Sequence, residues 1–212
     1  MEESVVVVGA GGFGREVLQW LRDAAAAGAG QRVRGFLDDT APDLSAFGLD
    51  VPVLGPVDPG RLGAGDRCIL AIGDPAVRLA LAARLEAAGV RFTTLVHPSA
   101  VVAPSARLGA GAVVCPFGFI GPDAMVGAHA LLNVRASVGH DARIGRAAVL
   151  SPHTCVGGAA EVADGAMLGS AAVVLPRQRV GEGARVAPGA VVHSAVPAGV
   201  LALGNPASWR RN

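Results

Sequence analysis

A histidine followed by an aspartate is the pair in this chain whose side chains best suit proton-transfer chemistry. His140 and Asp141 are adjacent, and His140 stands two places after the aliphatic Val138. An imidazole titrates near neutral pH and can take a proton from a nucleophile, while a neighbouring carboxylate can orient it. The pair therefore indicates a candidate general base. From the residues alone, an exposed histidine without a catalytic role is the alternative.

A glycine-rich run near the start of the chain has the spacing of a phosphate-binding loop. Gly9-Ala10-Gly11-Gly12-Phe13-Gly14 follows a β-branched stretch and precedes a helical one, where backbone N–H groups and the helix dipole can hold phosphates. Asp38 and Asp39 end the next expected strand, where a Rossmann domain places its ribose-binding carboxylate. The pattern predicts nucleotide binding, by either a dinucleotide cofactor or a nucleotide-sugar substrate. A tight turn with a solvated acidic end is the structural alternative.

The elements that would position these residues come in two kinds, and the first ninety-odd residues alternate strands with helices. The expected strands are Ser4–Val8, Val33–Leu37, Cys68–Ile72 and Arg91–Val96, and the expected helices are Phe13–Ala27 and Ala76–Ala88. This alternation is typical of βαβ units with a parallel sheet.

From about residue 100 a repeat of six residues replaces that alternation. Every sixth residue from Val102 to Val192 is Val, Leu or Ile, which gives sixteen consecutive matches. A small residue, nearly always Ala, stands two places before the match, with Thr154 and Gln178 as the larger exceptions, and Gly commonly follows the aliphatic residue. Six residues suit a short strand plus a corner, with the aliphatic side chain pointing inward. Three such units would form a triangular coil, and stacked coils would form a parallel β solenoid.

Stacked coils bring together residues that are three repeats apart in the sequence. Gly158 lies one coil after His140. A glycine at that level leaves its backbone N–H uncovered, and such an N–H beside a base could stabilise the oxyanion of a thioester carbonyl. At the other corners, glycine is expected to supply backbone freedom.

Composition excludes several classes of protein. Eighteen Lys and Arg against 17 Asp and Glu give a net charge of +1 without a long basic run, which argues against nucleic-acid binding. No long uninterrupted apolar stretch is present, and Met1-Glu2-Glu3 lacks the positive start of a signal peptide, so we expect a cytoplasmic protein without a membrane partner. The five histidines do not stack on one another in successive coils, so no metal site within one chain is predicted.

These motifs in this order resemble the NeuD/PglD-like sugar acyltransferases, whose hexapeptide repeats form a left-handed β-helix. The resemblance covers nearly the whole chain and includes the glycine-rich loop, Gly35–Asp39, Ile72-Gly73-Asp74, Asn133, His140-Asp141 and the ending Gly204-Asn205-Pro206-Ala207. It implies an α/β plus all-β fold, with a Rossmann-like βαβ domain over 1–97 and a left-handed parallel β-helix over 98–212. The left hand comes from the resemblance alone, because parallel β crossovers are normally right-handed.

The resemblance also implies roles for individual residues. His140 would be the general base, Asp141 would support it, and Gly158 would offer its amide to the acetyl carbonyl. Asn133 would lie in the same active-site cleft. The nucleotide-linked amino sugar would be held by Gly9, Gly11, Gly12, Phe13, Asp38, Asp39 and Gly73. Acetyl-CoA, the co-substrate, would lie along the later coils at a subunit boundary of a homotrimer, at Gly157, Gly158, Gly169 and Ser170.

Two positions depart from the family pattern on the acceptor side. Many members have a histidine where this chain has Phe13, and PglD has a second histidine where this chain has Val149. The expected reaction is direct acetyl transfer from acetyl-CoA to a sugar amine, without a metal. Three alternatives remain open: O-acetylation of a sugar hydroxyl, an NAD-binding protein with a trimerising β-helix scaffold, and a non-catalytic hexapeptide-repeat protein.

Overall fold

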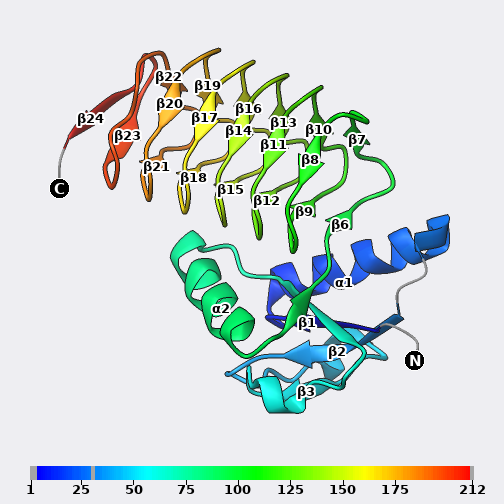
Figure 1. The fold of residues 1–212 in the computed structure, drawn as a ribbon. Coiled ribbons are helices and arrows are strands. Elements are labelled where there is room, and N and C mark those ends of the chain that lie inside the picture. Colours follow the sequence, from blue (N-terminus) through cyan, green and yellow to red (C-terminus); the bar gives the residue numbers. More distant parts are fainter. Residues whose placement is uncertain (1–3, 30–31, 211–212) are drawn as a thin grey trace.

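Two structural units follow one another along the chain (Figure 1). The computed structural model describes residues 4–29 and 32–210, so the acidic start Met1-Glu2-Glu3 lies outside the described residues. A five-stranded sheet with two helices is followed by a long stack of short strands. Among the described residues, no helix is long and apolar enough to cross a lipid bilayer.

The first unit is an open, all-parallel sheet in the order β3-β2-β1-β4-β5. Its elements are β1 (Ser4–Val8), α1 (Gly12–Ala24), β2 (Arg32–Leu37), β3 (Val53–Gly55), β4 (Asp66–Leu70), α2 (Pro75–Ala87) and β5 (Arg91–Phe92). A π-helical turn (Ala25–Ala29) extends α1, and two short 3-10 helices span Ser45–Phe47 and Pro59–Arg61. The parallel βαβ prediction is therefore confirmed.

Two of the expected elements differ from the structure. The predicted single strand Arg91–Val96 is wrong: Arg91–Phe92 pairs with β4, whereas Leu95–Val96 forms β6 and pairs with β9 in the second unit. The strand β3 was not predicted, because its three half-buried residues are too few for a periodic pattern.

Four consecutive valines explain the central position of β1. Val5 to Val8 are all buried, as expected for a parallel strand that is covered on both faces. One apolar cluster places α1 against the sheet, and a second places α2 on the opposite side. Asp74 caps α2, because its Oδ1 accepts hydrogen bonds from the backbone N–H groups of Ala76 (2.9 Å) and Val77 (3.1 Å).

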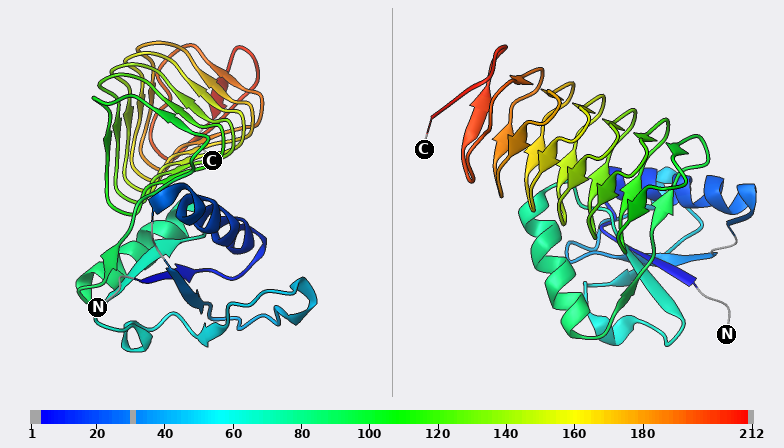
Figure 2. Two further views of the ribbon diagram at one scale, coloured as in Figure 1. Left: turned by 90° about the vertical axis from the view of Figure 1, so that its right-hand side faces the viewer. Right: turned by 45° about the horizontal axis from the view of Figure 1, so that its top comes forward.

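The second unit is a triangular β-helix of six-residue repeats, seen along its axis in the left view of Figure 2. Its strands are β6 (Leu95–Val96), β7 (Val101–Val102), β8 (Arg107–Leu108), β9 (Val113–Val114), β10 (Phe119–Ile120), β11 (Met125–Val126), β12 (Leu131–Leu132), β13 (Ser137–Val138), β14 (Arg143–Ile144), β15 (Val149–Leu150), β16 (Cys155–Val156), β17 (Glu161–Val162), β18 (Met167–Leu168), β19 (Val173–Val174), β20 (Arg179–Val180), β21 (Arg185–Val186) and β22 (Val191–Val192). A final antiparallel pair, β23 (Leu201–Leu203) and β24 (Ser208–Arg210), ends the stack.

The three faces of the β-helix differ in what they present outward. The docked face, from β6 to β21 with β23 and β24, packs against the first unit. The apolar face, from β7 to β22, exposes side chains such as Val101 and Phe119. The basic face, from β8 to β20, carries Arg107, Arg143 and Arg179. The corners between two adjacent faces form an edge of the β-helix, and each edge takes the names of the two faces that it joins.

The sixteen aliphatic positions form the interior of the β-helix, as predicted. Fourteen of them, from Val114 to Val192, are buried, and the two at the open end, Val102 and Leu108, are partly buried against the same core. Strands three repeats apart pair in parallel register, for example Val138 with Val156. The predicted stacking of residues three repeats apart is therefore confirmed.

The expected role of glycine after the aliphatic position is wrong. Gly139 and Gly157 do not have positive φ; instead, a Cβ on Gly139 would lie 2.7 Å from the Gly158 nitrogen, and one on Gly157 would lie 2.6 Å from the Pro176 nitrogen. These glycines allow close stacking of successive coils. The left-handed conformation falls on the third corner residue, which is mostly not glycine, as in Asp141 (φ 58°).

Candidate active site

His140 and Asp141 lie on the apolar–basic edge, in the corner between β13 and β14. The Nδ1 of His140 is 2.7 Å from the Oδ2 of Asp141, and both side chains are open to solvent, with 68% and 62% exposure. Asp141 adopts the left-handed conformation that turns the chain at this corner. A hydrogen bond from Nδ1–H to this carboxylate leaves the Nε2 lone pair free to accept a proton.

Gly158 lies directly beneath the His140 ring. A Cβ on residue 158 would be 2.5 Å from Nε2 and 2.7 Å from Cε1 of His140. The two coils are in register, because the Ala159 N–H donates to the His140 carbonyl at 2.8 Å. The predicted neighbourhood of His140 and Gly158 is therefore present in the structure, and glycine is what makes room for the imidazole.

The backbone N–H of Gly158 has no acceptor within the described part of the chain. The second residue of each corner donates no backbone hydrogen bond to the next coil. Proline occupies this position at Pro122, one coil before His140, and at Pro176, one coil after Gly158. Gly158 differs from these prolines because it keeps an N–H. An amide in this position, beside Nε2, has the character of an oxyanion-hole donor.

Three other predicted site residues lie on a different edge. Asn133, Gly169 and Ser170 are on the docked–apolar edge, on the opposite side of the apolar face from His140. The Oδ1 of Asn133 accepts a hydrogen bond from the Val134 N–H at 2.7 Å. Within one chain, therefore, the structure does not bring Asn133 together with His140, or Gly169 and Ser170 together with Gly157 and Gly158.

The glycine-rich loop joins the carboxyl end of β1 to α1, at the point where the strand order of the sheet reverses. Gly9 has φ 105°, and a Cβ there would lie 2.7 Å from the Ala71 carbonyl oxygen. A Cβ on Gly14 would collide with the Gly9 carbonyl, so glycine lets α1 pack on the loop. The N-terminus of α1 has no side-chain cap at Gly11, and its first N–H groups are open for an anion. Gly73 faces open space in the neighbouring β4–α2 loop.

The two adjacent aspartates have different surroundings. Asp38 binds its own loop: its Oδ2 accepts from the Ala10 N–H at 2.7 Å, and its Oδ1 accepts from the N–H and hydroxyl of Thr40. Burial alone would raise the pKa of Asp38, but these hydrogen bonds outweigh it and hold the pKa below its usual value. Asp39 is exposed, and its Oδ1 accepts from the Val57 N–H at 2.8 Å. Of the two, Asp39 has the oxygen that is open to a ligand.

A basic side chain that no sequence motif indicated lies at the mouth of the glycine-rich loop. The guanidinium of Arg15 lies 3.5 Å from the centre of the exposed Phe47 ring, and its Nη2 would be 3.8 Å from a Cβ on Gly12. No carboxylate pairs with Arg15 among the residues that the structure describes. A basic residue directly after Gly14 was the signal that could have pointed to it.

Both departures from the family pattern belong to one apolar cluster. Phe13 is partly buried, with its ring 5.9 Å from that of Trp20, and Val149 is 2% exposed. The cluster also contains Val134, the neighbour of Asn133. The apolar side chains of Phe13 and Val149 therefore contribute to the packing between the first unit and the docked face.

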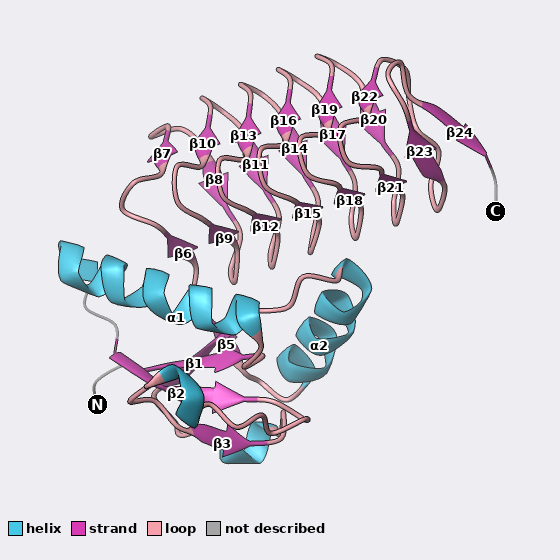
Figure 3. Ribbon diagram, turned by 180° about the vertical axis from the view of Figure 1, so that it is seen from behind, coloured by secondary structure: helices cyan, strands magenta, loops and turns pink. Residues whose placement is uncertain are grey.

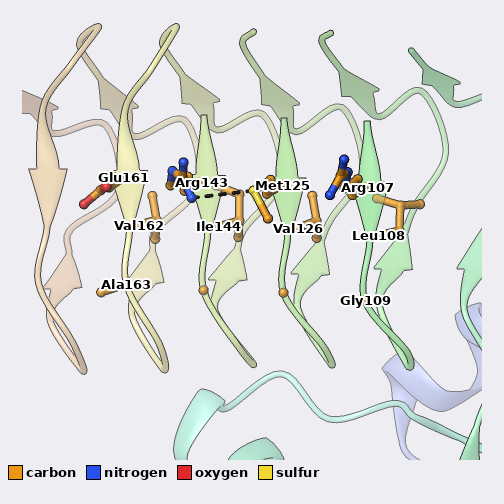
Figure 4. Close-up of a pocket in the computed structure, with 12 residues that line it drawn as sticks. Arg107, Leu108, Gly109, Met125, Val126, Arg143, Ile144, Glu161, Val162 and Ala163 are labelled. Carbon is orange, nitrogen blue, oxygen red and sulfur yellow. Dashed lines mark hydrogen bonds between the residues drawn. The ribbon is translucent and has the colours of Figure 1, made fainter. Parts of the chain in front are cut away.

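A groove of about 430 Å³ runs across the basic face over β8, β11, β14 and β17 (Figure 4). Small residues form one side, and Arg107, Met125, Arg143 and Glu161 form the other. Arg143 donates through Nη1 to the Met125 sulfur at 3.6 Å. None of the residues predicted to bind substrate lines this groove.

Comparison with known proteins gives matches over almost the whole chain. Residues 4–85 match the family model of the PglD N-terminal domain. A histidine-to-alanine variant of GDP-perosamine N-acetyltransferase from Caulobacter crescentus, solved with CoA and GDP-perosamine, is 33% identical over 99% of this chain and 97% of that one, with a TM-score of 0.88. The comparison with curated proteins gives no match.

Two further solved structures are similar over almost their full length. The acetyltransferase domain of PglB from Neisseria gonorrhoeae, in complex with acetyl coenzyme A, is 27% identical over 99% of this chain and 100% of that one, with a TM-score of 0.88. WeeI from Acinetobacter baumannii is 28% identical over 98% and 100%, with a TM-score of 0.81.

A Rossmann-like unit followed by a left-handed β-helix defines an enzyme of the acyltransferase class, and the predicted fold class is confirmed. The chain belongs to the NeuD/PglD-like family of sugar acetyltransferases, as the sequence motifs indicated.

Proposed function

We propose that this protein transfers an acetyl group from acetyl-CoA to the amino group of a nucleotide-activated amino sugar. The observation that carries the proposal is the position of the His140 imidazole. Its Nδ1 is hydrogen-bonded to Asp141, and its Nε2 lies directly over Gly158. The similar enzyme from Caulobacter crescentus is named as an N-acetyltransferase and was solved with CoA and a GDP-linked amino sugar, which supports this choice of donor and acceptor.

In the proposed reaction, neutral His140 acts as the general base. The amine nitrogen attacks the thioester carbonyl, a C–N bond forms, and Nε2 takes the amine proton. The carbonyl oxygen becomes an oxyanion that accepts from the Gly158 N–H. When the tetrahedral intermediate collapses, the C–S bond breaks and the sulfur leaves with the proton from His140. The acetyl group passes directly to the amine, and Asp141 stabilises the transient imidazolium.

The acceptor is proposed to bind on the first unit. The uncapped start of α1, with Gly9, Gly11 and Gly12, offers N–H groups to the diphosphate. Asp39 offers a free carboxylate oxygen to the nucleoside, and Gly73 leaves space opposite. On this reading residues 1–97 carry the acceptor and 98–212 carry the donor. Because nucleotide sugars and acetyl-CoA are metabolites of the cytoplasm, we place the reaction there.

A homotrimer is proposed because the site residues of one chain lie on two edges. The apolar face between those edges exposes Val101 (61%) and Phe119 (44%), which an association between copies would cover. Rotation about a threefold axis would set the apolar–basic edge of one protomer against the docked–apolar edge of the next. His140, Gly157 and Gly158 of one protomer would then share a cleft with Asn133, Gly169 and Ser170 of its neighbour, with acetyl-CoA between them.

The direct test is thiol release from acetyl-CoA against a panel of UDP-, GDP- and dTDP-linked amino sugars. A sugar with hydroxyl groups only and NAD serve as controls. Release with an amino sugar that requires His140 supports the proposal. Release with the hydroxyl sugar alone would make the protein an O-acetyltransferase, and NAD binding without any release would make the β-helix a scaffold.

Subunit complementation tests the shared cleft. His140→Ala and Asn133→Ala would each be inactive, but mixed trimers would contain clefts in which neither variant residue takes part. For random mixing in equal amounts we expect about one quarter of the wild-type sites to be intact. A mixture that stays inactive would contradict a cleft that joins His140 of one protomer to Asn133 of its neighbour. An Asn133→Ala enzyme that is active by itself would place Asn133 outside the cleft.

A further inference from the structure

We propose that Arg78 is a positioning residue, which fixes the acceptor-binding loops of the first unit relative to the β-helix. The inference rests on the proposed function, since it concerns where the acceptor is held. Arg78 lies on α2 and is 0% exposed, although its side chain carries a charge. Its guanidinium donates to three backbone carbonyls, two in the first unit and one in the second.

The guanidinium holds the end of β4 and the loop that follows it. Nη1 donates to the carbonyls of Leu70 (3.0 Å) and Ile72 (2.8 Å). Leu70 ends β4, and Ile72 precedes Gly73 in the β4–α2 loop. This loop lies against the glycine-rich loop, because a Cβ on Gly9 would be 2.7 Å from the Ala71 oxygen and 2.8 Å from Cδ1 of Ile72. A shift of the Arg78 partners would therefore move both loops of the proposed acceptor site.

The other side of the same guanidinium holds the β-helix. Nε and Nη2 donate to the His129 carbonyl at 3.0 and 2.6 Å. His129 forms the corner before β12, and β12 leads directly to Asn133. One planar group therefore links the acceptor loop to the strand that carries a proposed cleft residue. Figure 3 shows α2 beside the sheet and below the β-helix, next to both units that the guanidinium joins.

The shape of arginine matters for this link. Burial lowers the pKa of Arg78 to about 10, so the side chain stays charged at neutral pH. No carboxylate pairs with it in the described ranges, and the carbonyl dipoles are its compensation. A guanidinium directs its N–H groups to both sides in a fixed plane, whereas an ammonium is a point donor. A lysine could keep the charge and donate to the carbonyls of one unit, but it could not donate to the carbonyls of both units at once.

Glu86 provides a matched control at the same interface. From α2 it accepts from Nη2 of Arg146 at 2.6 Å and pairs with Nε2 of His129 at 2.8 Å, so it also joins α2 to the β-helix. Within the described residues, its hydrogen bonds go to His129 and Arg146 and not to the loop from Leu70 to Gly73. A general loss of adhesion between the units should appear in Glu86→Gln, whereas loss of loop position should appear only in Arg78 variants.

The kinetic test compares wild type, Arg78→Lys and Glu86→Gln with the nucleotide amino sugar that wild type acetylates. For Arg78→Lys we expect the KM for the sugar to rise about tenfold, the change that corresponds to about 1.4 kcal/mol, while the KM for acetyl-CoA stays constant. Glu86→Gln should lower Tm and leave both KM values constant. Equal effects of the two variants on the KM for the sugar, or an unchanged value in Arg78→Lys, would overturn the inference.

Hydrogen exchange of the free protein tests the same inference without any turnover. In Arg78→Lys, peptides from 66–75 and 5–14 should exchange at least threefold faster than in wild type, because the amides of Ala71 and Gly9 lose the support of the loop. Peptides from 149–192 should exchange as in wild type, which excludes global unfolding. Unchanged exchange in 66–75 would overturn the inference. If wild type acetylates no sugar, the proposed function fails, while this measurement still decides the positioning role.

Discussion

The His140 ring occupies the space that a side chain on residue 158 would need, with Nε2 2.5 Å from the position of a Cβ there. The proposed general base and the amide proposed to face the oxyanion are therefore positioned by one stacking contact between successive coils. The hydrogen bond from the Ala159 N–H to the His140 carbonyl, at 2.8 Å, keeps the two coils in register. Neither residue depends on a flexible loop for its place.

Replacing Gly158 by alanine should show how much the activity depends on the position of the His140 ring, because the variant keeps both the imidazole and the backbone N–H. The new Cβ would force the imidazole away from its seat, while the backbone N–H and His140 itself remain. We expect kcat to fall about 100-fold, the lower end of what a positioned base contributes, with little change in Tm. Steady-state kinetics and a thermal melt check this. Pro122→Ala, at the equivalent position one coil before His140, is the control and should keep its kcat. A Gly158→Ala enzyme that also kept its kcat would contradict the claim that Gly158 positions the imidazole.

The two aspartates after β2 should have different effects on the acceptor. Asp39→Asn removes the charge of an exposed carboxylate and should raise the KM for the nucleotide sugar several-fold without changing Tm. Asp38→Ala leaves the N–H groups of Ala10 and Thr40 without their acceptor and should cost about 1–3 kcal/mol of stability. Kinetics combined with denaturant unfolding distinguishes the two. Equal loss of stability in both variants would show that Asp39 is structural as well.

Acid should destabilise the contact between the two units through His129. Burial lowers the pKa of His129, nearby Arg146 and Arg78 act in the same direction, and the hydrogen bond to Glu86 opposes them without reversing the shift. The unfolded chain therefore binds a proton below about pH 6.5 that the folded chain resists, so stability is lost as the pH falls. One such group contributes at most about 1.4 kcal/mol per pH unit.

Unfolding measured between pH 7.5 and pH 5.5 checks this. His129→Asn should have a smaller slope of unfolding free energy against pH than wild type, whatever its absolute stability. A slope that is the same in both proteins would assign the acid sensitivity to other groups. Glu86 should stay ionised over this range, because its hydrogen bond with Arg146 holds the pKa of Glu86 below its usual value.

A charge on the apolar face should prevent association. Phe119 is 44% exposed on β10 and lies away from both proposed edges of the cleft. Phe119→Glu should give a monomer by light scattering and lower the turnover, because the cleft would lose the neighbour's edge. Arg107→Glu, on the basic face, is the matched control. An active Phe119→Glu monomer would contradict a site shared between protomers.

The sequence was sufficient to predict the β-helix and its internal register, because a repeat of six with an aliphatic residue at each turn has few other packings. It also placed Gly158 under His140, since stacking relates them directly. It did not predict that His140 and Asn133 lie on different edges, because residues seven apart look close until the corners are assigned to faces. Arg15, Phe47 and Arg78 were also missed, since their roles arise from contacts between loops or between units that no local pattern encodes.

The most direct test of the account is the effect of removing the proposed base on chemistry and on donor binding separately. We expect His140→Ala to lower kcat by about 10²- to 10⁴-fold, the range of general-base catalysis, while acetyl-CoA binds with unchanged Kd by calorimetry. His193→Ala, an exposed histidine on the same edge in the last coil, should behave as wild type. A His140→Ala enzyme that keeps its kcat would contradict the central claim.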